Sequence, residues 1–437
     1  MKLLRLIVGI LLLSVLSGQA EELSLYQVAL RALQQHPDQN LAQAQLDGAK
    51  AGVKQTSAAF YPSFDGVVSY RPQKSLVGSS SSPVVFRGFN DYYLSAVGSQ
   101  TLFDSGRRKH RSRSADLNEA AFSHLREDTV QSRLEQAAQA FFQLAFALER
   151  LRLEEQNIGL SQMRLDNALS KQEGPSCAPD QALSQADLSL AESRYLEAQN
   201  AEEIARIALA GAMGEAEPYR GALQEHRLPD NLPQADEVLD RACQLRPDLL
   251  AATARAQAAE SRVKAARADY RPKLDLSAGY QVYSTDPSLN LRAWRLGLDL
   301  SFPIFKDPQL SGAVDQALAA REQAEARQRL LELRINTEVQ SSFLNAQLLK
   351  RRVEQARLAA DQAYNSFQLT WNQYQNGNGT CRSVSIAQRD YLDAQRNALA
   401  VELQYQLALL QKYRSSGTLS LETFQVGGPK APTRRHP

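Results

Sequence analysis

The sequence predicts an α+β membrane protein that is built from two copies of one helix–β-hairpin–helical-hairpin unit. Three observations predict this fold class: a duplicated segment, stretches in which apolar and polar residues alternate, and long runs of heptad spacing. Duplication sets the organisation of the chain. Alternation with a period of two indicates strands with one apolar face, and heptads indicate long helices in coiled-coil contact.

The first twenty residues are expected to be a signal peptide that takes no part in the fold. Lys2 and Arg5 precede an apolar run over residues 6–16, and Gly18-Gln19-Ala20 has the small residues of a cleavage site. A lipoprotein would carry a cysteine where Gln19 stands, so we expect no lipid anchor. No later stretch approaches the apolar length of a membrane-spanning helix.

Composition and motifs argue against an enzyme and against a nucleic-acid-binding protein. The 437 residues include 50 basic and 48 acidic side chains, for a net charge of +2, and such a balance indicates no nucleic-acid partner. The five histidines are scattered without the spacing of metal ligands. No glycine-rich phosphate loop or nucleophile elbow is found, so we expect no enzymatic activity and no cofactor.

The duplication is found when the chain is aligned with itself at a shift of 210 positions. Residues 28–70 then match the second segment at 15 of 43 positions, far more often than chance allows. Because a residue before proline avoids helical geometry, Pro37 and Pro247 are expected to end a short opening helix. Pro62 and Pro272 are expected to be the breaks at which the next, alanine-rich helix gives way to a strand.

These boundaries divide the chain into five segments. After the signal peptide (1–20), the first structural repeat covers 21–214 and a proline-containing linker covers 215–233. The second repeat covers 234–419, and a basic, proline-rich end (420–437) is expected to be disordered.

Alternation of apolar and polar residues predicts one β-hairpin in each repeat. The predicted strands cover about 63–70 and 92–103 in the first repeat, with a serine-rich loop near 76–82, and about 273–283 and 293–303 in the second. A strand of about nine residues is long enough to cross a bilayer when it is tilted. Tyr70 and Tyr280 fall on the predicted lipid-facing side. The plain alternative is a small soluble sheet.

Heptad spacing predicts a helical hairpin after each pair of strands, over about 107–214 and 308–414. Apolar or small residues follow a 4-3 spacing from Val130 to Leu151 and again from Ile335 to Phe367. Such seams pack helices in coiled-coil contact. Glycine-containing breaks near 172–179 and 375–382 are expected to reverse the chain and so to form two helical tips.

Four strands cannot close a barrel, and an open sheet edge in lipid leaves backbone groups unpaired. The chain is therefore expected to oligomerise. A dimer would supply eight strands and a trimer twelve; because only a barrel well above eight strands leaves an open lumen, a conduit favours the trimer.

The order of these segments resembles the TolC-type outer-membrane factors of Gram-negative export systems, over about residues 23–419. The resemblance rests on duplicated and tip motifs, none of which is specific alone: His36-Pro37-Asp38 with Arg246-Pro247-Asp248, Pro62 with Pro272, Thr101-Leu102-Phe103-Asp104-Ser105-Gly106 with Pro303-Ile304-Phe305, Asn378-Gly379-Thr380, Ala387-Gln388, Leu392-Asp393-Ala394-Gln395, and Gly417-Thr418-Leu419.

The resemblance implies a homotrimer in the lipid of the cell outer membrane, with a twelve-stranded barrel and a long periplasmic helical extension. It implies docking to a periplasmic adaptor (a membrane fusion protein) and to an inner-membrane ABC exporter or proton-driven pump. The expected function is a passive exit duct of a tripartite export system. Drug, metal, polysaccharide and protein cargoes all remain open.

Two other classes of function stay open. A periplasmic coiled-coil adaptor or scaffold protein is the alternative, but an adaptor would have compact β domains and no membrane-length alternation over 274–302. A protein of this fold that serves only as a structural component of the envelope is the other.

The candidate site residues lie at the two helical tips. The expected adaptor-docking surface consists of Gly174, Ser176, Cys177, Gly379, Thr380, Cys381, Arg382 and Ser383. The alternative is that Gly174 and Gly379 only allow the backbone to turn. Cys177 and Cys381 occupy nearly equivalent tip positions, which leaves two hypotheses: a disulfide, or two unpaired small residues.

Three further expectations concern charge and burial. Family members that gate their tunnel with acidic residues carry them just after the second tip, where this chain has Ser383, Ser385 and Gln388, so we expect no acidic ring. Cys243 is expected to be a small core residue. Five cations are expected to mark the inner boundary between membrane and water, or simply a solvated helix start: Arg107, Arg108, Lys109, Arg111 and Arg113.

Overall fold

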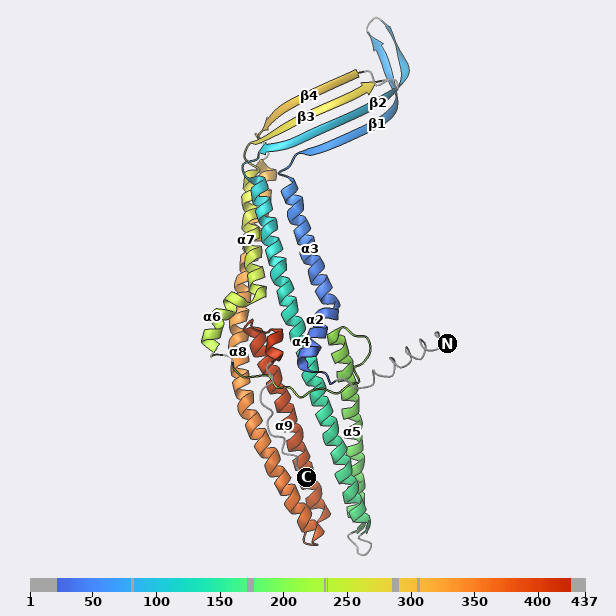
Figure 1. Ribbon diagram of the computed structural model, residues 1–437, viewed down its shortest axis with the longest axis vertical. Helices are drawn as coiled ribbons and strands as arrows, with labels where there is room; N and C mark the ends of the chain where they lie inside the picture. The colour runs from blue at the N-terminus through green and yellow to red at the C-terminus, as the bar shows by residue number, and fades with distance from the viewer. Residues whose placement is uncertain are drawn as a thin grey trace, which may run out of the picture. The chain divides into compact units, whose positions relative to one another are not determined.

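The computed structural model describes residues 22–79, 82–170, 177–231, 233, 235–284, 291–304 and 307–425 (Figure 1). The chain divides into two compact units. Unit 1 contains Met1–Ala42, Arg126–Pro247 and Glu332–Pro437, and unit 2 contains Gln43–Leu125 and Asp248–Leu331. Each unit therefore takes segments from both predicted repeats. The predicted signal peptide lies outside the described residues.

Helices make up most of the described chain, in the order that the sequence predicts. They are α2 (Leu25–Gln35), α3 (Pro37–Ala58), α4 (Arg107–Ser170), α5 (Cys177–Met213), α6 (Ala235–Leu245), α7 (Pro247–Ala268), α8 (Asp307–Gln375) and α9 (Cys381–Ser415), followed by the 3₁₀ helix η1 (Leu421–Phe424). None of the described helices is long and apolar enough to span a membrane.

Local signals fix where the helices begin and end. Ser24 caps α2 through a capping box, because its hydroxyl accepts from the amide of Gln27 at 3.2 Å while the Gln27 side chain accepts from the Ser24 amide at 2.9 Å. The opening helices α2 and α6 end just before Pro37 and Pro247, as predicted.

Most residues of the two predicted heptad seams are buried, which confirms the coiled-coil interpretation. Leu134, Phe141 and Leu144 of α4 join one hydrophobic core in unit 1 with residues of α2, α5, α8 and α9. On α8 the seam is buried from Ile335 to Phe367, and small alanines occupy several of its positions.

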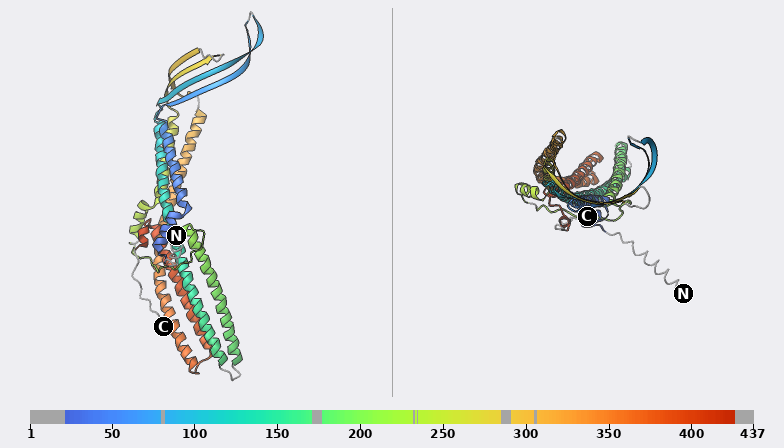
Figure 2. Two further views of the ribbon diagram at one scale, coloured as in Figure 1. Left: turned by 45° about the vertical axis from the view of Figure 1, so that its right-hand side comes forward. Right: turned by 90° about the horizontal axis from the view of Figure 1, so that it is seen from above.

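The four strands form one antiparallel sheet in the order β1-β2-β3-β4 (Figure 2). Their bounds are β1 Ser63–Ser79, β2 Ser82–Phe103, β3 Lys273–Ser284 and β4 Leu291–Ser301. The chain thus pairs the first hairpin with the second through β2 and β3, with Ala96 opposite Tyr280 and Tyr280 opposite Trp294.

The first hairpin is longer than predicted. The expectation of a loop near 76–82 is wrong, because the pairing of β1 with β2 continues from Arg71 opposite Asp91 to Ser79 opposite Ser82. Polar cross-strand contacts support part of this extension: the Gln73 amide donates to the Asp91 carboxylate at 2.6 Å. Antiparallel pairing uses backbone groups, so the serines and glycines of this segment did not stop the strands.

Two smaller expectations also need correction. The segment from residue 420 is not wholly disordered, because η1 packs Phe424 into the core of unit 1 beside α2; residues 426–437 lie outside the described residues. Cys243 is exposed rather than buried. It follows Ala242 on the amphipathic helix α6, whose buried side holds Val238 and Ala242.

Candidate functional site

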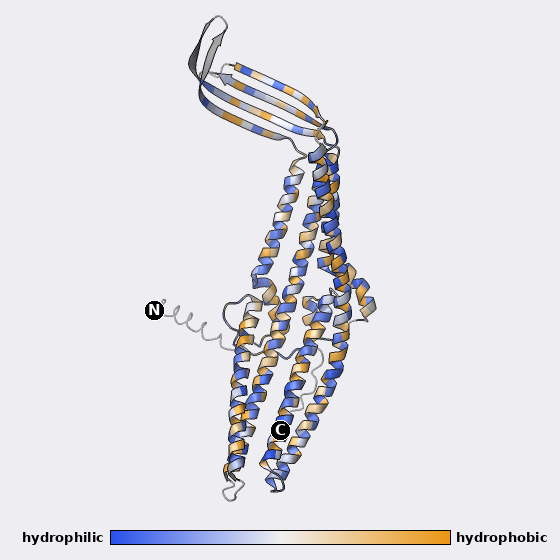
Figure 3. Ribbon diagram, turned by 180° about the vertical axis from the view of Figure 1, so that it is seen from behind, coloured by the Kyte–Doolittle hydropathy of each residue, from blue (hydrophilic) through white to orange (hydrophobic). Residues whose placement is uncertain are grey.

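Hydrophobic and hydrophilic residues alternate along the strands (Figure 3), and the register places them on opposite faces, so that the sheet has one apolar face and one polar face. Tyr70 and Tyr280 lie on the apolar face, as predicted, together with Phe64, Val68, Leu94, Leu276, Trp294, Leu296, Leu298 and Leu300. Trp294 is 79% exposed and Phe64 is 82% exposed. So large an exposed apolar surface is suited to lipid rather than to water.

The opposite face carries short polar side chains and charges. It includes Asp65, Ser95, Ser99, Thr101, Asp275, Ser277, Gln281, Arg295 and Asp299. Thr101 donates to the Asp275 carboxylate at 2.6 Å, and Lys273 pairs with the same carboxylate at 2.7 Å. This face can line a water-filled passage.

Both edges of the sheet are open within the described residues, since β1 and β4 each pair with one neighbour only. An open edge presents a row of unpaired backbone N–H and C=O groups. In lipid such groups must find a partner strand. The described chain offers none, so a further chain is needed.

The helices α5 and α8 lie at the two flanks of unit 1 (Figure 1). Each carries exposed aliphatic side chains opposite its buried seam. These residues are Leu196, Ile204 and Ile207 on α5 and Leu333, Leu344, Leu348, Leu358 and Leu369 on α8. Leu344 is 68% exposed, although Ala346 beside it is buried in the seam. Each flank helix therefore has a second apolar stripe that nothing in the described chain covers.

The α8–α9 turn forms the second helical tip. Gly377 has a φ of +81°, which favours glycine. At Gly379 a Cβ atom would lie 2.9 Å from the backbone nitrogen of Tyr374, so glycine is required there by close approach. Thr380 caps α9, with a capping box to Ser383.

An aromatic cluster stiffens the same hairpin. The rings of Phe367 and Tyr391 stack at 5.7 Å, and those of Tyr364 and Tyr391 lie 5.3 Å apart. Trp371 and Tyr374 continue the cluster toward the turn, at 6.1 Å. The tip is therefore held by packing across α8 and α9.

The predicted tip residues differ in what they present to solvent. Thr380 and Arg382 are exposed, but Cys381 is fully buried and lies 3.4 Å from the Ser184 hydroxyl of α5. Gly174, Ser176 and the side chain of Cys177 lie outside the described residues. Cys381 is a free cysteine in the described chain, and its pairing with Cys177 stays a prediction.

Ser385 and Gln388 belong to a buried polar network between α4, α5 and α9. Arg164 is 1% exposed and donates to Gln388 at 3.2 Å and to Asp187 at 2.5 Å. Ser385 donates to the same Asp187 carboxylate at 2.6 Å. The position at which some family members carry acidic gating residues is thus used here for contacts between helices.

The network extends along α4 to a second ion pair. The Gln388 amide donates to Asn157 at 3.3 Å, and Asn157 donates to Glu154 at 3.3 Å. Arg396 of α9 donates two hydrogen bonds to the Glu154 carboxylate, at 2.7 and 2.8 Å. Burial alone would raise the pKa of Glu154, but the hydrogen bonds and charge of Arg396, together with the Asn157 hydrogen bond and the charge of Arg194, outweigh burial and lower the pKa.

Our sequence interpretation missed this network, although a signal for it exists. Four polar residues of α4 follow the 3-4-3 spacing of a helical seam: Glu154, Asn157, Ser161 and Arg164. Charged residues that continue a seam must find partners across it, because an unpaired charge is costly to bury.

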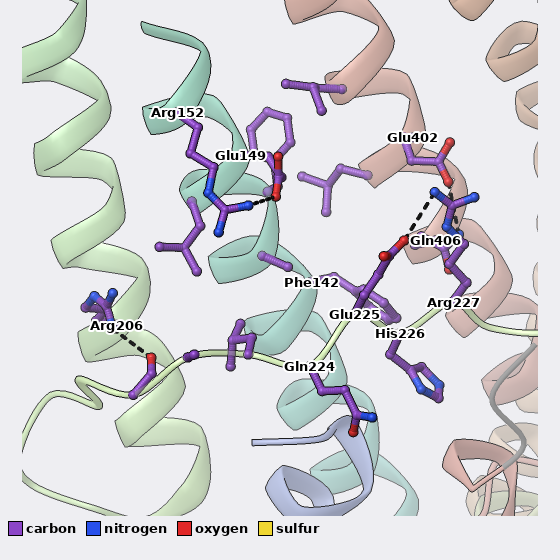
Figure 4. Close-up of a pocket in the computed structure, with 18 of the residues that line it drawn as sticks. Phe142, Glu149, Arg152, Arg206, Gln224, Glu225, His226, Arg227, Glu402 and Gln406 are labelled. Atoms are coloured by element: carbon purple, nitrogen blue, oxygen red, sulfur yellow. Dashed lines mark hydrogen bonds and ion pairs between the residues drawn. The ribbon is translucent and has the colours of Figure 1, made fainter. Parts of the chain in front are cut away.

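A pocket of about 820 Å³ lies between α4, α9 and the linker in unit 1 (Figure 4). Phe142, Leu223 and Leu403 are among its apolar lining residues. The arginines that line it are already engaged: Arg152 by Glu149 at 2.5 Å, and Arg227 by Glu225 at 3.6 Å. Arg206 and Arg220 pair with Glu202 and Glu203. The pocket thus has no uncommitted arginine for an ionic ligand.

The described residues contain no cluster of three or more potential metal ligands. The arrangement instead offers a two-faced sheet, two open strand edges, two uncovered helical stripes and a rigid tip. These are features of a wall segment in a larger assembly.

Comparisons with known proteins agree with this description. The sequence profile of the family described as outer membrane efflux protein matches residues 28–215 and 238–418. The chain is 26% identical over 402 residues to the pyoverdine export outer membrane protein OpmQ of Pseudomonas aeruginosa. This alignment covers 89% of the chain and 83% of OpmQ. It is 25% identical to the cation efflux system protein CusC of Escherichia coli O6:H1, over 91% of this chain and 84% of CusC.

Among solved structures, the CmeC outer membrane channel of Campylobacter jejuni superposes with a TM-score of 0.79. The alignment covers 92% of this chain and 90% of CmeC at 17% identity. This likeness supports the fold. The two segments matched by the family profile fall on the two copies of the repeated unit.

Proposed function

Since the chain belongs to the outer membrane efflux protein family, and so acts in the outer membrane as an export channel, we propose that three copies close one conduit. Each copy would supply four strands to a twelve-stranded barrel. The observation that carries this proposal is the sheet with one apolar face, one polar face and two open edges. Joining β4 of one copy to β1 of the next would pair the edges.

The flank helices support the same closure. The aliphatic stripe on α8 and the stripe on α5 lie on opposite flanks of unit 1. A head-to-tail contact between the α8 stripe of one copy and the α5 stripe of its neighbour would bury both. Such a heterologous contact generates a ring when the rotation closes. Helices from three copies would then form a periplasmic tunnel.

Charged substitutions on the α8 stripe test this assembly. Leu344→Glu with Leu348→Glu places two carboxylates on a surface that is exposed in one chain, so the chain should still fold. We expect native mass spectrometry of the detergent-solubilised protein to find three chains per particle for the unaltered protein and single chains for the variant. Asn345→Glu, exposed one residue along the same helix, is the matched control and should stay trimeric.

Persistence of the trimer in the Leu344→Glu, Leu348→Glu variant would contradict the proposed contact. A particle of two or four chains in the unaltered protein would contradict the twelve-stranded barrel.

We further propose that the helical tips dock to a periplasmic adaptor, which would connect the channel to an inner-membrane ABC exporter or proton-driven pump. Exposed Thr380 and Arg382 support a docking surface that continues along α9 to Ile386 and Arg389. Gly379 and Ser383 would shape the turn rather than touch the adaptor, because close approach and capping occupy them. Gly174, Ser176 and Cys177 remain proposed members.

The docking proposal is tested by charge reversal at the tip. Arg382→Glu with Arg389→Glu should abolish export by intact cells while the channel still reaches the outer membrane as a trimer. Full export by this variant would refute the docking surface. Export that fails together with trimer formation would instead report a folding defect.

A further inference from the structure

Aromatic side chains gather where the sheet of unit 2 meets its helices. Phe60, Tyr61 and Tyr270 are exposed at the two breaks between helix and strand, and Phe103 and Phe302 are exposed at strand ends. Membrane β-proteins carry such aromatic girdles at the boundary between the lipid tails and the headgroups. This level of unit 2 therefore corresponds to the headgroup region on the helical side of the membrane.

Phe60 lies on the lipid-facing side of the sheet. The side-chain amide of Gln100 donates to the Phe60 carbonyl oxygen at 3.2 Å. Gln100 stands opposite Leu276 in the register, among the residues of the apolar face. The ring of Phe60 also lies under the Arg108 guanidinium, 5.1 Å from it. The neighbourhood of Phe60 is thus accessible from lipid rather than from the polar face.

A pocket of about 540 Å³ opens beside Phe60. The first three turns of α4 and the last three turns of α7 form its wall. The pocket is lined by Phe60, Lys109, His110, Ser112, Arg113, Asp116, Ser261 and Lys264. Residues 109, 112, 113 and 116 share one face of α4. Three cations face one carboxylate, so the pocket carries net positive charge.

Two of these cations have no partner among the described residues. In the described part of the chain, no hydrogen bond or ion pair engages Lys109 or Arg113. Their neighbours differ, because Arg107 pairs with Asp269 at 3.1 Å and Arg108 with Asp104 at 3.1 Å. Lys264 is held only loosely by Glu260, at 3.5 Å. Uncommitted cations in a hollow are free to bind an external anion.

We propose that this pocket binds the phosphate headgroup of an anionic phospholipid in the leaflet that faces the helices. Lys109 and Arg113 would engage the phosphate from α4, and Lys264 would engage it from α7. The acyl chains would pass Phe60 toward the apolar face of the sheet. The inference rests on the proposed placement of the sheet in the outer membrane. Basic pockets at membrane surfaces bind anionic headgroups in this way.

Lipid binding to the full-length protein in detergent tests the proposal without any transport measurement. Native mass spectrometry would compare added phosphatidylglycerol, phosphatidylethanolamine and inorganic phosphate. We expect the unaltered protein to bind phosphatidylglycerol in preference to the other two. Lys109→Gln with Arg113→Gln should weaken that binding about tenfold or more, because each cation near an anionic lipid surface contributes roughly a factor of five.

A matched control removes two exposed cations from α8 of the same unit. Arg327→Gln with Arg329→Gln removes the same amount of charge. These residues lie about 30 Å along α8 from the first residue of that helix, and their replacement should leave the affinity for phosphatidylglycerol unchanged. Lys264→Gln removes one cation from the other wall and should weaken binding about fivefold, which provides a second test if the double variant folds poorly.

Three results would overturn the proposal. They are equal binding of phosphatidylglycerol and phosphatidylethanolamine, unchanged affinity in both pocket variants, and binding of inorganic phosphate as tight as that of the lipid, which would indicate a site for free phosphate. A failure of trimer closure or of adaptor docking would leave this lipid measurement unaffected, so the two sets of results can be told apart.

Discussion

Among the contacts that hold the linker to α8 and α9, the carboxylate of Asp230 binds two lysines, and removing its charge gives a sharp prediction. Asp230 accepts from Lys412 of α9 at 2.9 Å and from Lys350 of α8 at 3.0 Å. The Tyr413 hydroxyl also donates a hydrogen bond to the Pro229 carbonyl oxygen of the linker at 2.8 Å. Asp230→Asn keeps the shape of the side chain and removes its charge.

The two lysines contribute unequally. The Lys412 side chain is only 10% exposed, and a hydrogen bond between charged groups at such a site contributes about 1.5–3 kcal/mol. The Lys350 side chain is 54% exposed, and an exposed pair contributes about 0–1 kcal/mol. Asp230→Asn should therefore cost about 2 kcal/mol in the free energy of linker opening, or roughly a thirtyfold larger open population.

Hydrogen exchange at the Leu228 amide measures this opening. That amide donates to the Gln406 side chain at 3.0 Å, so exchange requires the linker to leave α9. We expect exchange at pH 7 about thirtyfold faster in Asp230→Asn. Glu225→Gln, which alters a 68% exposed carboxylate, should leave the rate unchanged. Equal protection of Leu228 in Asp230→Asn and the unaltered protein would refute the reasoning.

The same contact predicts a pH dependence. Burial alone would raise the pKa of Asp230, but the hydrogen bonds and the positive charges of Lys412 and Lys350 together outweigh burial and lower the pKa below the ordinary 3.8. A lowered pKa in the folded state stabilises the protein above the ordinary value and loses its effect as the pH falls through the lowered one. The difference between Asp230→Asn and the unaltered protein should therefore shrink as the pH falls below 3.8 and vanish once the pH lies below the lowered pKa of Asp230.

Three further predictions concern the tip and the cysteines. Arg164→Ala leaves Asp187 without its buried cation and should cost about 3–5 kcal/mol, measured as earlier thermal unfolding of the solubilised protein; unchanged unfolding would contradict the burial of the pair. Gly379→Ala should lower the free energy of unfolding by about 1–3 kcal/mol, because the new Cβ would collide with the backbone of Tyr374. Gly48→Ala, in open space within α3, should raise it by up to about 1 kcal/mol. Equal shifts in the unfolding temperature of the two variants would refute this contrast. A maleimide should label exposed Cys243 in the folded protein and fully buried Cys381 only after unfolding, and rapid labelling of both would contradict the packing of the tip.

The elements that could be predicted from the sequence are those whose periodicity reports burial. The heptads from Ile335 to Phe367 and the alternation over 274–302 each record which face of an element meets apolar surroundings. The outer half of the first hairpin escaped prediction because residues 71–91 mix polar and apolar residues without regular alternation, yet the strands there pair through backbone groups. Side-chain patterns carry no record of such pairing.

The tip was predicted less well than the fold, for a different reason. Glycine and a capping residue mark a turn near Thr380, but the contacts of Arg164 with Asp187 and Gln388 join helices that are distant in sequence. Only the assembled fold brings them together. Sequence spacing alone also could not reveal that Cys381 points inward against Ser184 of α5.

The meeting of the first and last elements has a consequence for how the chain is made. Helix α2 packs against η1, and Leu25 and Phe424 share one core. Unit 1 therefore stays incomplete until nearly the whole chain has been synthesised, because its N-terminal helix has no final partner before then. Contacts of such large sequence separation form slowly. A chain shortened before Leu421 would keep every strand and every long helix, yet its core would be left open at the point where the two ends of the chain should meet.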